Sequence, residues 1–228
     1  MLHRGQRILE IGSGWGGLAF YLAHVADVDV TGVTLSTEQH TYAQRRADEI
    51  GVGKHVRFLL EDYRQRDGRY DRVVSVGMFE HVGVGHYREY FEKVSGLLED
   101  GGIALIHTIG RNRPEPMNGW IERRIFPGAQ PPSLGQMMAI FEPRAFSVLD
   151  VENLRLHYAE TLRHWTARYL AGIDQVSSAR GEEFARAWHL YLAGSTAAFT
   201  TGTMQLFQVL FARSRNNDLP ATRRHLYA

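Results

Sequence analysis

Short apolar runs alternate with helix-like segments through the first half of the chain, and this order constrains the fold more than any other feature of the sequence. Runs typical of buried strands lie at 7–11, 29–35, 55–60, 69–77 and 103–110. Segments with the apolar spacing of helices lie between them, at 15–26, 36–50 and 88–98. A β-α-β-α order predicts an α/β fold with a mostly parallel sheet and helices on both faces.

The alternation breaks at Arg111. Residues 111–136 hold five of the seven prolines, and we expect an ordered but irregular insertion there. The remaining elements are expected to be strands at 146–151 and 204–212 and helices at about 159–170 and 182–198. An insertion between late elements of a doubly wound sheet covers the carboxyl ends of the strands, where such folds bind ligands. We therefore expect a single domain, 1–228, with a substrate cap within 111–200.

Length, charge and cysteine content exclude several classes of protein. With 228 residues the chain can bury a substantial core, and its formal net charge of +1 gives no general attraction to nucleic acid. The absence of cysteine excludes disulfides and thiolate zinc sites, and we expect no metal. No apolar run reaches the roughly 18 residues of a membrane span, and the first residues lack a signal-peptide pattern. We expect a cytoplasmic protein.

A glycine-rich loop, EIGSGWGG at 10–17, follows the first expected strand and opens a helix. Glycines let the backbone approach a ligand closely, and a helix N-terminus offers free N–H donors. Gly12, Gly14 and Gly17 also fit the GxGxxG pattern of nicotinamide dehydrogenases, and a glycine turn without a ligand is the plain structural alternative. Two features argue against a dehydrogenase. Glu10 precedes the loop, as in S-adenosylmethionine sites. The second strand also ends in TLS, without the acid that a ribose diol needs in an NAD site.

Titratable side chains stand where two other apolar strands end. The run RVVSVGMF leads directly into Glu80 and His81, and His107 interrupts the strand IALIHTIG. Neighbours in an extended segment point in opposite directions, so we expect Glu80 to face the site and His81 to be structural. The competing interpretations are a glutamate that caps a turn and a histidine that is hydrogen-bonded in the core.

Longer motifs carry a family resemblance along nearly the whole chain. In order, they are ILEIGSGWGGLA, VTGVTLSTEQ, DYRQRDGRYDRVVSVGMFEHVGVGHYREYF, LIHTIG, IFPG, LRLHYAETLRHW and LPATRRHLYA. Together they resemble the cyclopropane-fatty-acyl-phospholipid synthase family, which shares several blocks with mycolic-acid cyclopropane and methyl transferases. The resemblance implies a Rossmann-like, seven-stranded class I methyltransferase fold. It also implies transfer of a methylene group from S-adenosylmethionine to the cis double bond of a phospholipid acyl chain, which forms a cyclopropane ring, with a bound bicarbonate ion as base.

The resemblance gives roles to residues at matching positions. The cofactor-binding residues, with Glu10 added from the loop pattern, are Glu10, Gly12, Gly14, Thr34, Leu35, Gln39, Asp62 and Tyr63. Of these, the two glycines are implied to line the methionine and ribose, and Asp62 and Tyr63, whose alternative is a solvated loop, to flank the adenine. The implied catalytic residues, which hold the bicarbonate, are Glu80, His107, Tyr158 and the backbone of Ile109.

The implied reaction explains why polar groups stand at strand ends. Attack of a double bond on a sulfonium methyl leaves a carbocation, which must lose a proton before the ring closes. The base must lie beside the methyl donor in a pocket closed to water, because water traps the cation. Aromatic faces also stabilise cations, and the candidates are Phe79, Trp120, Phe126, Tyr158, Trp165 and Tyr169.

Other functions remain open from the sequence. A branched-chain fatty-acyl or mycolic-type methyltransferase shares the base site but resolves the cation without ring closure. A small-molecule methyltransferase predicts a compact polar pocket. Relatives usually carry a segment before the first strand that closes over the cofactor, whereas the first strand here begins at Arg7. An inactive truncated fragment, a chain completed by a separate N-terminal chain, and a homodimer are the resulting alternatives.

Several further residues carry weaker expectations. Basic residues that could contact anionic phospholipid headgroups are Arg111, Arg113, Arg123 and Arg124 in the insertion and Arg213, Arg215, Arg223 and Arg224 in the tail. They predict peripheral association with the inner membrane surface, and a solvated surface is the alternative. Ser195, where many relatives carry cysteine, is expected to be a helical packing residue. The Met137-Met138 pair and the Leu and Phe residues of 184–211 are expected to be core rather than lipid tunnel.

Overall fold

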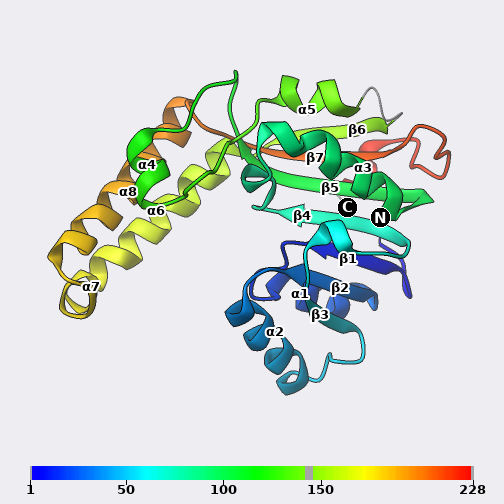
Figure 1. Ribbon diagram of the computed structural model, residues 1–228, viewed down its shortest axis with the longest axis horizontal. Coiled ribbons are helices and arrows are strands. Elements are labelled where there is room, and N and C mark those ends of the chain that lie inside the picture. The colour runs from blue at the N-terminus through cyan, green and yellow to red at the C-terminus, as the bar shows by residue number, and fades with distance from the viewer. Residues whose placement is uncertain (1, 142–145, 227–228) are drawn as a thin grey trace.

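Seven strands form one sheet in the order β3-β2-β1-β4-β5-β7-β6 (Figure 1). The computed structural model describes residues 2–141 and 146–226. The strands are β1 (Arg7–Ile11), β2 (Asp29–Thr34), β3 (Val56–Leu60), β4 (Tyr70–Val76), β5 (Leu98–Gly110), β6 (Phe146–Asn153) and β7 (Gln205–Arg213). The first five strands are paired in parallel, and β7 runs antiparallel to both β5 and β6.

Helices cover both faces of the sheet and extend beyond one end of it. They are α1 (Gly17–Ala26), α2 (Thr37–Glu49), α3 (Tyr87–Leu97), α4 (Gly119–Arg124), α5 (Leu134–Phe141), α6 (Arg155–Ala171), α7 (Ile173–Arg180) and α8 (Glu182–Thr201). Short 3-10 turns include η1 (Tyr63–Gln65), η2 (Phe79–His81), η3 (Val84–His86) and η5 (Arg223–Leu226). None of the helices in the described residues is long and apolar enough to cross a membrane.

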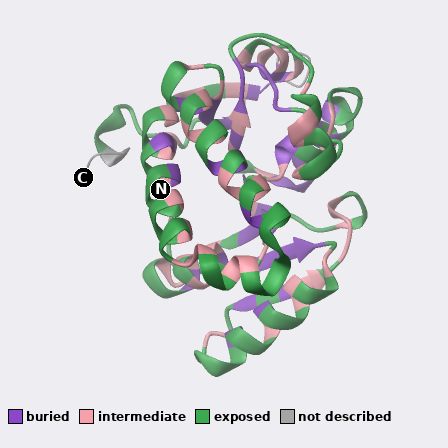
Figure 2. Cartoon of the chain, turned by 90° about the vertical axis from the view of Figure 1, so that its left-hand side faces the viewer, coloured by how far each residue is buried: buried purple, intermediate pink, exposed green. Residues whose placement is uncertain are grey.

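Two apolar cores lie on opposite faces of the sheet. Along β1, Ile8 belongs to one core and Leu9 and Ile11 to the other, as the alternation of side chains in a strand requires. The first core is closed by α1 and α2, whose buried residues are all alanines (Ala19, Ala23, Ala43 and Ala47), and Phe20 of α1 packs edge-on against Phe58 of β3. The second is closed by α3 and α5 with larger aromatic side chains. Figure 2 shows this buried interior beneath the largely exposed outer faces of the helices.

A helical lobe made of α4, α6, α7 and α8 projects beyond the sheet (left in Figure 1). Helices α6–α8 of the lobe leave the sheet after β6 and return at β7, two neighbouring strands, whereas α4 belongs to the segment between β5 and β6. The lobe's own apolar core includes Leu162, Leu192 and Phe199. The lobe is therefore a separately packed cap that the ends of two central strands face.

The predicted α/β class and all seven strands are confirmed, and residues 111–136 are largely irregular, as predicted, except for two short helical stretches that the prediction missed. That segment contains α4 and the start of α5. Asn118 caps α4 by accepting the N–H groups of Trp120 and Ile121 at 3.0 and 3.2 Å. Ser133 and Gln136 form a reciprocal capping box at α5, with bonds of 2.9 and 3.2 Å. Local capping thus starts short helices despite the neighbouring prolines.

Other differences concern boundaries. The helix α7 has no counterpart among the predicted elements, α6 begins earlier than predicted, at Arg155, and β5 begins at Leu98, so that the EDGG segment lies within the strand. The Met137-Met138 prediction is confirmed, since Met137 is fully buried and Met138 packs against the same core. The last two residues of the LPATRRHLYA motif, Tyr227 and Ala228, lie outside the described residues.

Candidate active site

The glycine loop after β1 has the backbone of a ligand cradle. Gly12, Gly14 and Gly16 have φ values of 82°, 54° and 85°, in the left-handed region that favours glycine. The N–H groups of Gly12 and Ser13 both donate to the carbonyl of Val33 at 3.0 Å, which ties the loop to the end of β2. A Cβ atom at Gly14 would meet nothing within 4 Å, whereas at Gly12 it would lie 2.8 Å from the Cβ of Met78. The loop is therefore open on one side and packed against the segment after β4 on the other.

Polar and apolar groups stand together at the end of β2. The Thr34 hydroxyl donates to Oε1 of Gln39 at 2.8 Å, and Ser36 caps α2 by accepting the N–H of Gln39 at 3.2 Å. Between them the side chain of Leu35 is 74% exposed. The structure thus brings the predicted residues Thr34, Leu35 and Gln39 to one edge of the sheet, beside the glycine loop.

The two predicted adenine-flanking residues begin η1, after β3. Asp62 accepts the N–H of Arg64 at 2.9 Å and forms an ion pair with its guanidinium at 2.6 Å. The hydrogen-bonded guanidinium lowers the pKa of Asp62. Tyr63 is half-buried and packs edge-on against Tyr90, with ring centroids 5.3 Å apart, and burial raises its pKa. Asp62 is therefore an ionised, held carboxylate rather than a freely solvated one.

Glu10 lies on the face of β1 that α1 covers. Its side chain is 3% exposed, it accepts a hydrogen bond from the backbone of Ala19, and its Oε2 has no partner among the described residues. Burial raises the pKa of Glu10 to about 8, so the carboxyl is largely protonated at pH 7. The structure places this predicted cofactor residue beneath the first turn of the helix, not on the open side of the loop.

Glu80 lies in η2, directly after β4, and is 5% exposed. Its Oε1 accepts the backbone N–H of Ile109 in β5, and its Oε2 is buried without a partner in the described residues. Burial raises the pKa of Glu80 and favours the protonated carboxyl. Glu80 thus reaches the end of the neighbouring strand β5. The Ile109 amide N–H, predicted as an anion ligand, is engaged here by Glu80.

His107 is held from the neighbouring strand. It pairs with Gln208 in the antiparallel register of β5 and β7, and its Nδ1 lies 3.0 Å from Nε2 of that glutamine. Burial lowers the pKa of His107, so the neutral imidazole predominates at pH 7. The histidine is therefore hydrogen-bonded within the sheet, as the structural alternative expected, and it also lines the cavity described next.

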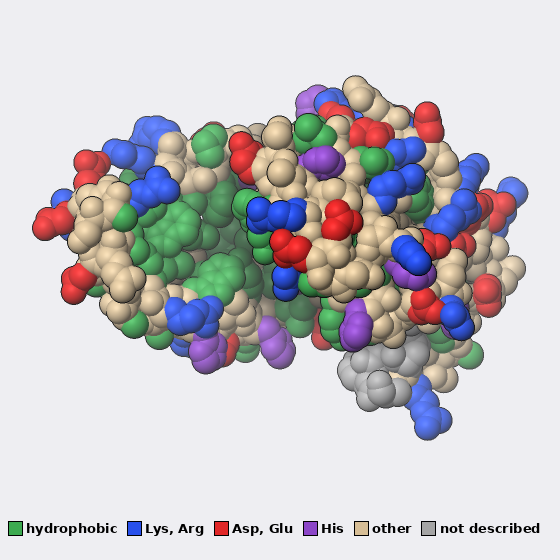
Figure 3. All heavy atoms as spheres, turned by 90° about the horizontal axis from the view of Figure 1, so that it is seen from below, with side chains coloured by type: hydrophobic (Ala, Val, Ile, Leu, Met, Phe, Trp, Pro, Cys, Tyr) green, Lys and Arg blue, Asp and Glu red, His purple; other side chains and the backbone are tan. Residues whose placement is uncertain are grey.

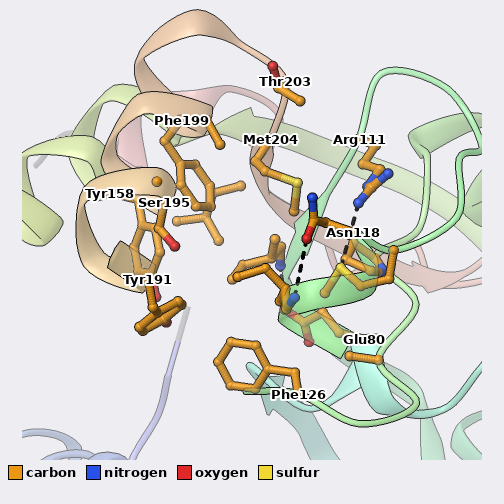
Figure 4. Close-up of a pocket in the computed structure, with 18 of the residues that line it drawn as sticks. Glu80, Arg111, Asn118, Phe126, Tyr158, Tyr191, Ser195, Phe199, Thr203 and Met204 are labelled. Atoms are coloured by element: carbon orange, nitrogen blue, oxygen red, sulfur yellow. Dashed lines mark hydrogen bonds between the residues drawn. The ribbon is translucent and has the colours of Figure 1, made fainter. Parts of the chain in front are cut away.

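One cavity of about 710 Å³ lies between the strand ends and the helical lobe. Glu80, His107, Ile109 and Tyr158 all line it, which brings the four predicted catalytic residues together. Tyr158 comes from α6 and meets Phe199 edge-on at 4.7 Å, and burial raises its pKa to about 12. Figure 3 shows the hollow as a recess lined by hydrophobic side chains, and in Figure 4 the lobe residues face the sheet side across an open space.

The aromatic candidates separate into two groups. Trp120, Phe126 and Tyr158 line the cavity, and Tyr191 and Phe199, which sequence reasoning missed, line it as well. Phe79 is instead fully buried and stacked on Tyr87 at 4.5 Å, Trp165 lies edge-on behind Tyr158, and the Tyr169 hydroxyl bonds the carbonyl of Ala185.

Two residues expected to be structural also line the cavity, namely His81 and Ser195. The backbone after β4 turns directly into η2, so His81 is not in an extended segment and the alternation argument does not apply to it. Ser195 lies between Tyr191 and Phe199 at helical spacing on α8, which places all three on one face. This spacing in the sequence could have identified the α8 wall of the cavity. Leu190, Phe199 and Leu206 also line the cavity, which corrects the expectation that the apolar residues of 184–211 are core rather than lipid tunnel.

The two arginine clusters differ in exposure. Arg111 is buried and donates to the carbonyl of Pro116 at 2.8 Å, while Arg123 and Arg124 are exposed on α4. In the tail, Arg213 bonds backbone carbonyls of the α3–β5 junction and Arg223 forms an ion pair with Asp150 at 2.8 Å. Backbone carbonyls hold Arg111 and Arg213, which fits neither the expected headgroup contact nor its alternative, a solvated surface.

The sheet order and the glycine loop define the class of the protein as a class I S-adenosylmethionine-dependent methyltransferase fold. The solved cyclopropane synthase MmaA2 from Mycobacterium tuberculosis superposes with a TM-score of 0.87 at 29% identity, over 93% of this chain and 79% of that one. The mycolic acid cyclopropane synthase CmaA1, complexed with SAH and CTAB, gives a TM-score of 0.85 at 31% identity, over 92% of this chain and 79% of that one.

The family described as mycolic acid cyclopropane synthetase matches residues 1–209, and the chain belongs to that family. It is 42% identical to the cyclopropane-fatty-acyl-phospholipid synthase of Escherichia coli K12, over 97% of this chain and 57% of the relative. It is 38% identical to a probable fatty acid methyltransferase of Pseudomonas putida, over 99% of this chain and 60% of the relative. The chain thus spans 57% and 60% of the length of these two curated relatives.

The strand ends fit S-adenosylmethionine. The open space at Gly14 leaves room for a ligand against the glycine backbone. The Thr34–Gln39 pair offers hydroxyl and amide groups to a ribose. Large apolar side chains are exposed around the same edge at Trp15 (56%), Leu35 (74%) and Leu60 (50%), and an adenine ring packs well on such surfaces.

Proposed function

We propose that this chain transfers a methylene group from S-adenosylmethionine to the cis double bond of an unsaturated phospholipid acyl chain and so forms a cyclopropane ring. The observation that carries the proposal is the cavity of about 710 Å³, whose wall is mostly aliphatic and aromatic and includes Glu80, His107 and Tyr158 among its polar groups. A pocket of this kind suits an acyl chain better than a small polar substrate. The printed name of the Escherichia coli relative states the same substrate class.

The chain's residues have three tasks in this reaction. S-adenosylmethionine supplies an electrophilic methyl group when it is bound. The apolar lobe excludes water from the acyl chain, which protects the carbocation formed by attack of the double bond. The faces of Trp120, Phe126 and Tyr158 stabilise that positive charge. Polar groups at the strand ends then hold the base that removes a proton from the new methyl group, so that the ring closes.

We propose bicarbonate as that base, held beside Glu80, His107 and Tyr158. The buried Oε2 of Glu80 has no partner in the described residues, and a bound ion would satisfy it. A carboxylate would repel an anion, but burial raises the pKa of Glu80 and so favours the protonated form, which can donate. Tyr158, with a pKa of about 12, is likewise a donor at neutral pH. In this proposal the N–H of Ile109 fixes the orientation of Glu80.

A contact with the membrane surface would deliver the substrate, and we propose that it is peripheral. Trp120 and Ile121 of α4 border the cavity, and Arg123 and Arg124 are exposed on the same helix. Each basic residue near an anionic surface contributes about 1 kcal/mol. Binding to anionic vesicles is therefore expected to weaken with added salt and in the Arg123→Gln/Arg124→Gln variant. Binding that is independent of salt would contradict this contact.

A branched-chain fatty-acyl methyltransferase is the second candidate, favoured by the 38% identity to the Pseudomonas putida relative. Both candidates are tested by incubating the protein with S-adenosylmethionine, bicarbonate and vesicles of cis-unsaturated phospholipid. Gain of one CH2 with loss of the double bond in the extracted acyl chains supports cyclopropanation. Gain of one CH2 with the double bond kept supports the second candidate, and unchanged acyl mass contradicts both for this chain. Glu122→Gln, an exposed change on α4, is a matched control for Glu80→Gln.

A further inference from the structure

The hydrogen bond between Gln208 and His107 fixes which ring nitrogen of the histidine carries the proton. The two residues are 101 positions apart in sequence and meet only because β5 and β7 pair in antiparallel register. The Gln208 amide is oriented with Nε2 toward His107, and because an amide nitrogen can only donate, this orientation makes Nδ1 of His107 the acceptor across the 3.0 Å separation. A neutral imidazole that accepts at Nδ1 carries its proton on Nε2.

The protonation state of His107 agrees with this assignment. Burial lowers its pKa, so the ring is neutral at pH 7 and has one proton to place. The charged or titratable residues that line the same cavity as His107 are Glu80, His81, Arg111, Tyr158 and Tyr191, and Glu152 of β6 pairs with Gln208. Burial raises the pKa of Glu80, which favours its protonated form, and it raises the pKa of Tyr158 to about 12, so the Tyr158 hydroxyl is a donor at this pH. With its proton on Nε2, the neutral ring has one N–H donor available.

We propose that Gln208 is a positioning residue that holds His107 as the Nε2–H tautomer, so that the imidazole presents an N–H donor to an oxygen ligand beside Glu80 and Tyr158. The proposal rests on the proposed function for the identity of that ligand, an oxyanion, but its statement about the proton concerns only residues of this chain. With the opposite tautomer, Nε2 would present a lone pair to the anion and repel it. Gln208, on the neighbouring strand β7, therefore determines whether His107 attracts or repels the ligand.

The position of the proton on the His107 ring is measured directly, without turnover, by NMR of protein labelled with ¹⁵N-histidine. The His107→Gln variant identifies the signals of His107 among those of the 11 histidines. At pH 7.5 we expect Nδ1 of His107 to resonate as an unprotonated nitrogen and Nε2 as a protonated one. The isosteric Gln208→Glu variant can only accept, so its Nδ1 is expected to become protonated. An Nδ1–H tautomer in the wild-type protein would overturn the proposal, whether or not the chain is an active enzyme.

The matched control is Gln136→Glu. Gln136 is also half-buried, but it lies on α5, and its Oε1 accepts the N–H of Ser133 at 2.9 Å, a bond that glutamate keeps. The His107 signals of the Gln136→Glu variant are expected to match those of the wild-type protein. The Gln208→Leu variant removes the bond without adding charge, and a mixture of both tautomers is expected there. Pure Nε2–H tautomer in Gln208→Leu would also overturn the proposal, because Gln208 would then not be what selects it.

Substitutions of Gln208 are also expected to change catalysis. Residues that orient metal-ligating histidines contribute about 10- to 100-fold, and because Gln208 orients His107 in the same way, Gln208→Leu is expected to lower kcat by a similar factor with little change in KM for S-adenosylmethionine. In Gln208→Glu the new carboxylate raises the pKa of His107, and below that pKa both ring nitrogens carry protons. Its activity relative to wild type is therefore expected to be highest at low pH and to fall as pH rises. A deficit that is the same at every pH would indicate a purely structural role and contradict the proposal.

Discussion

Replacing Glu10 with glutamine is expected to stabilise the fold at neutral pH but not at acidic pH. The buried Glu10 carboxyl has a pKa raised from 4.5 to about 8, chiefly by desolvation. In the unfolded chain the same carboxyl ionises near its ordinary pKa. Between these two pH values the unfolded state has therefore lost a proton that the folded state keeps, so the free energy of unfolding falls as pH rises. The stability is fully present below pH 4.5 and decreases above it.

The magnitude follows from the size of that interval. In the unfolded chain, pH 7 lies about 2.5 pH units above the ordinary pKa of this carboxyl. At about 1.36 kcal/mol per unit, the wild-type protein loses about 3 kcal/mol of its free energy of unfolding. Glutamine has nearly the same shape and does not titrate. The free energy of unfolding of Glu10→Gln is thus expected to exceed that of wild type by about 3 kcal/mol at pH 7, and by nearly nothing at pH 4. For a chain of this size the gain corresponds to roughly 6–12 °C in Tm.

Urea denaturation at pH values from 4 to 8 measures this difference. The exposed Glu122→Gln variant is the control and is expected to follow the wild-type curve. A Glu10→Gln difference that does not change with pH, or a destabilised variant at pH 7, would refute the assignment of a neutral, buried carboxyl. Affinity for S-adenosylmethionine, measured on the same samples, is expected to be kept, because the side chain lies beneath α1. A loss of affinity would instead support the cofactor role predicted from the loop pattern.

Three further substitutions test separate parts of the site. Gly12→Ala puts a Cβ into a left-handed backbone position with φ 82°, and is expected to destabilise the protein by at least ~1 kcal/mol and weaken S-adenosylmethionine binding in calorimetry. Gly119→Ala, at an unstrained position, should do neither. Ser36→Ala removes the cap of α2 and is expected to cost about 1 kcal/mol in thermal unfolding; an unchanged Tm would show that the cap contributes nothing. Tyr158→Phe keeps the ring but removes a donor, and kcat is expected to fall about 100-fold; wild-type kcat would exclude the hydroxyl from the site. Tyr169→Phe is its control, since that hydroxyl bonds Ala185 outside the cavity.

The sheet could be predicted because its signals are local. β-branched runs, the glycine loop and the Ser36 cap each specify their own segment, and parallel strands bring their carboxyl ends to one edge without further information. For the same reason Glu80 and His107, which end neighbouring strands, could be expected to converge. The capping box at Ser133 was equally readable, but the surrounding prolines pointed to an irregular segment instead.

The walls of the cavity could not be read in the same way, because they depend on tertiary pairing. Gln208 was visible only as a polar residue in the apolar run MQLFQVLFA, and its partner is set by the β5–β7 register. Whether Tyr191 and Phe199 face a cavity or a core depends on how α8 packs on α6 and α4, since both environments select the same apolar residues. The burial of Glu10 likewise follows from the position of α1 over β1.

The most direct test of the account uses S-adenosylmethionine labelled with CD3 and vesicles of a cis-monounsaturated phospholipid, followed by mass spectrometry of the released acyl chains. Ring closure requires one proton of the transferred methyl to leave, to the base held near Glu80, His107 and Tyr158. The account therefore predicts a saturated-ring product that keeps two of the three deuterium atoms and has no double bond. A product that keeps all three deuterium atoms would show that the methyl is never deprotonated, and would contradict cyclopropanation as the reaction of this chain.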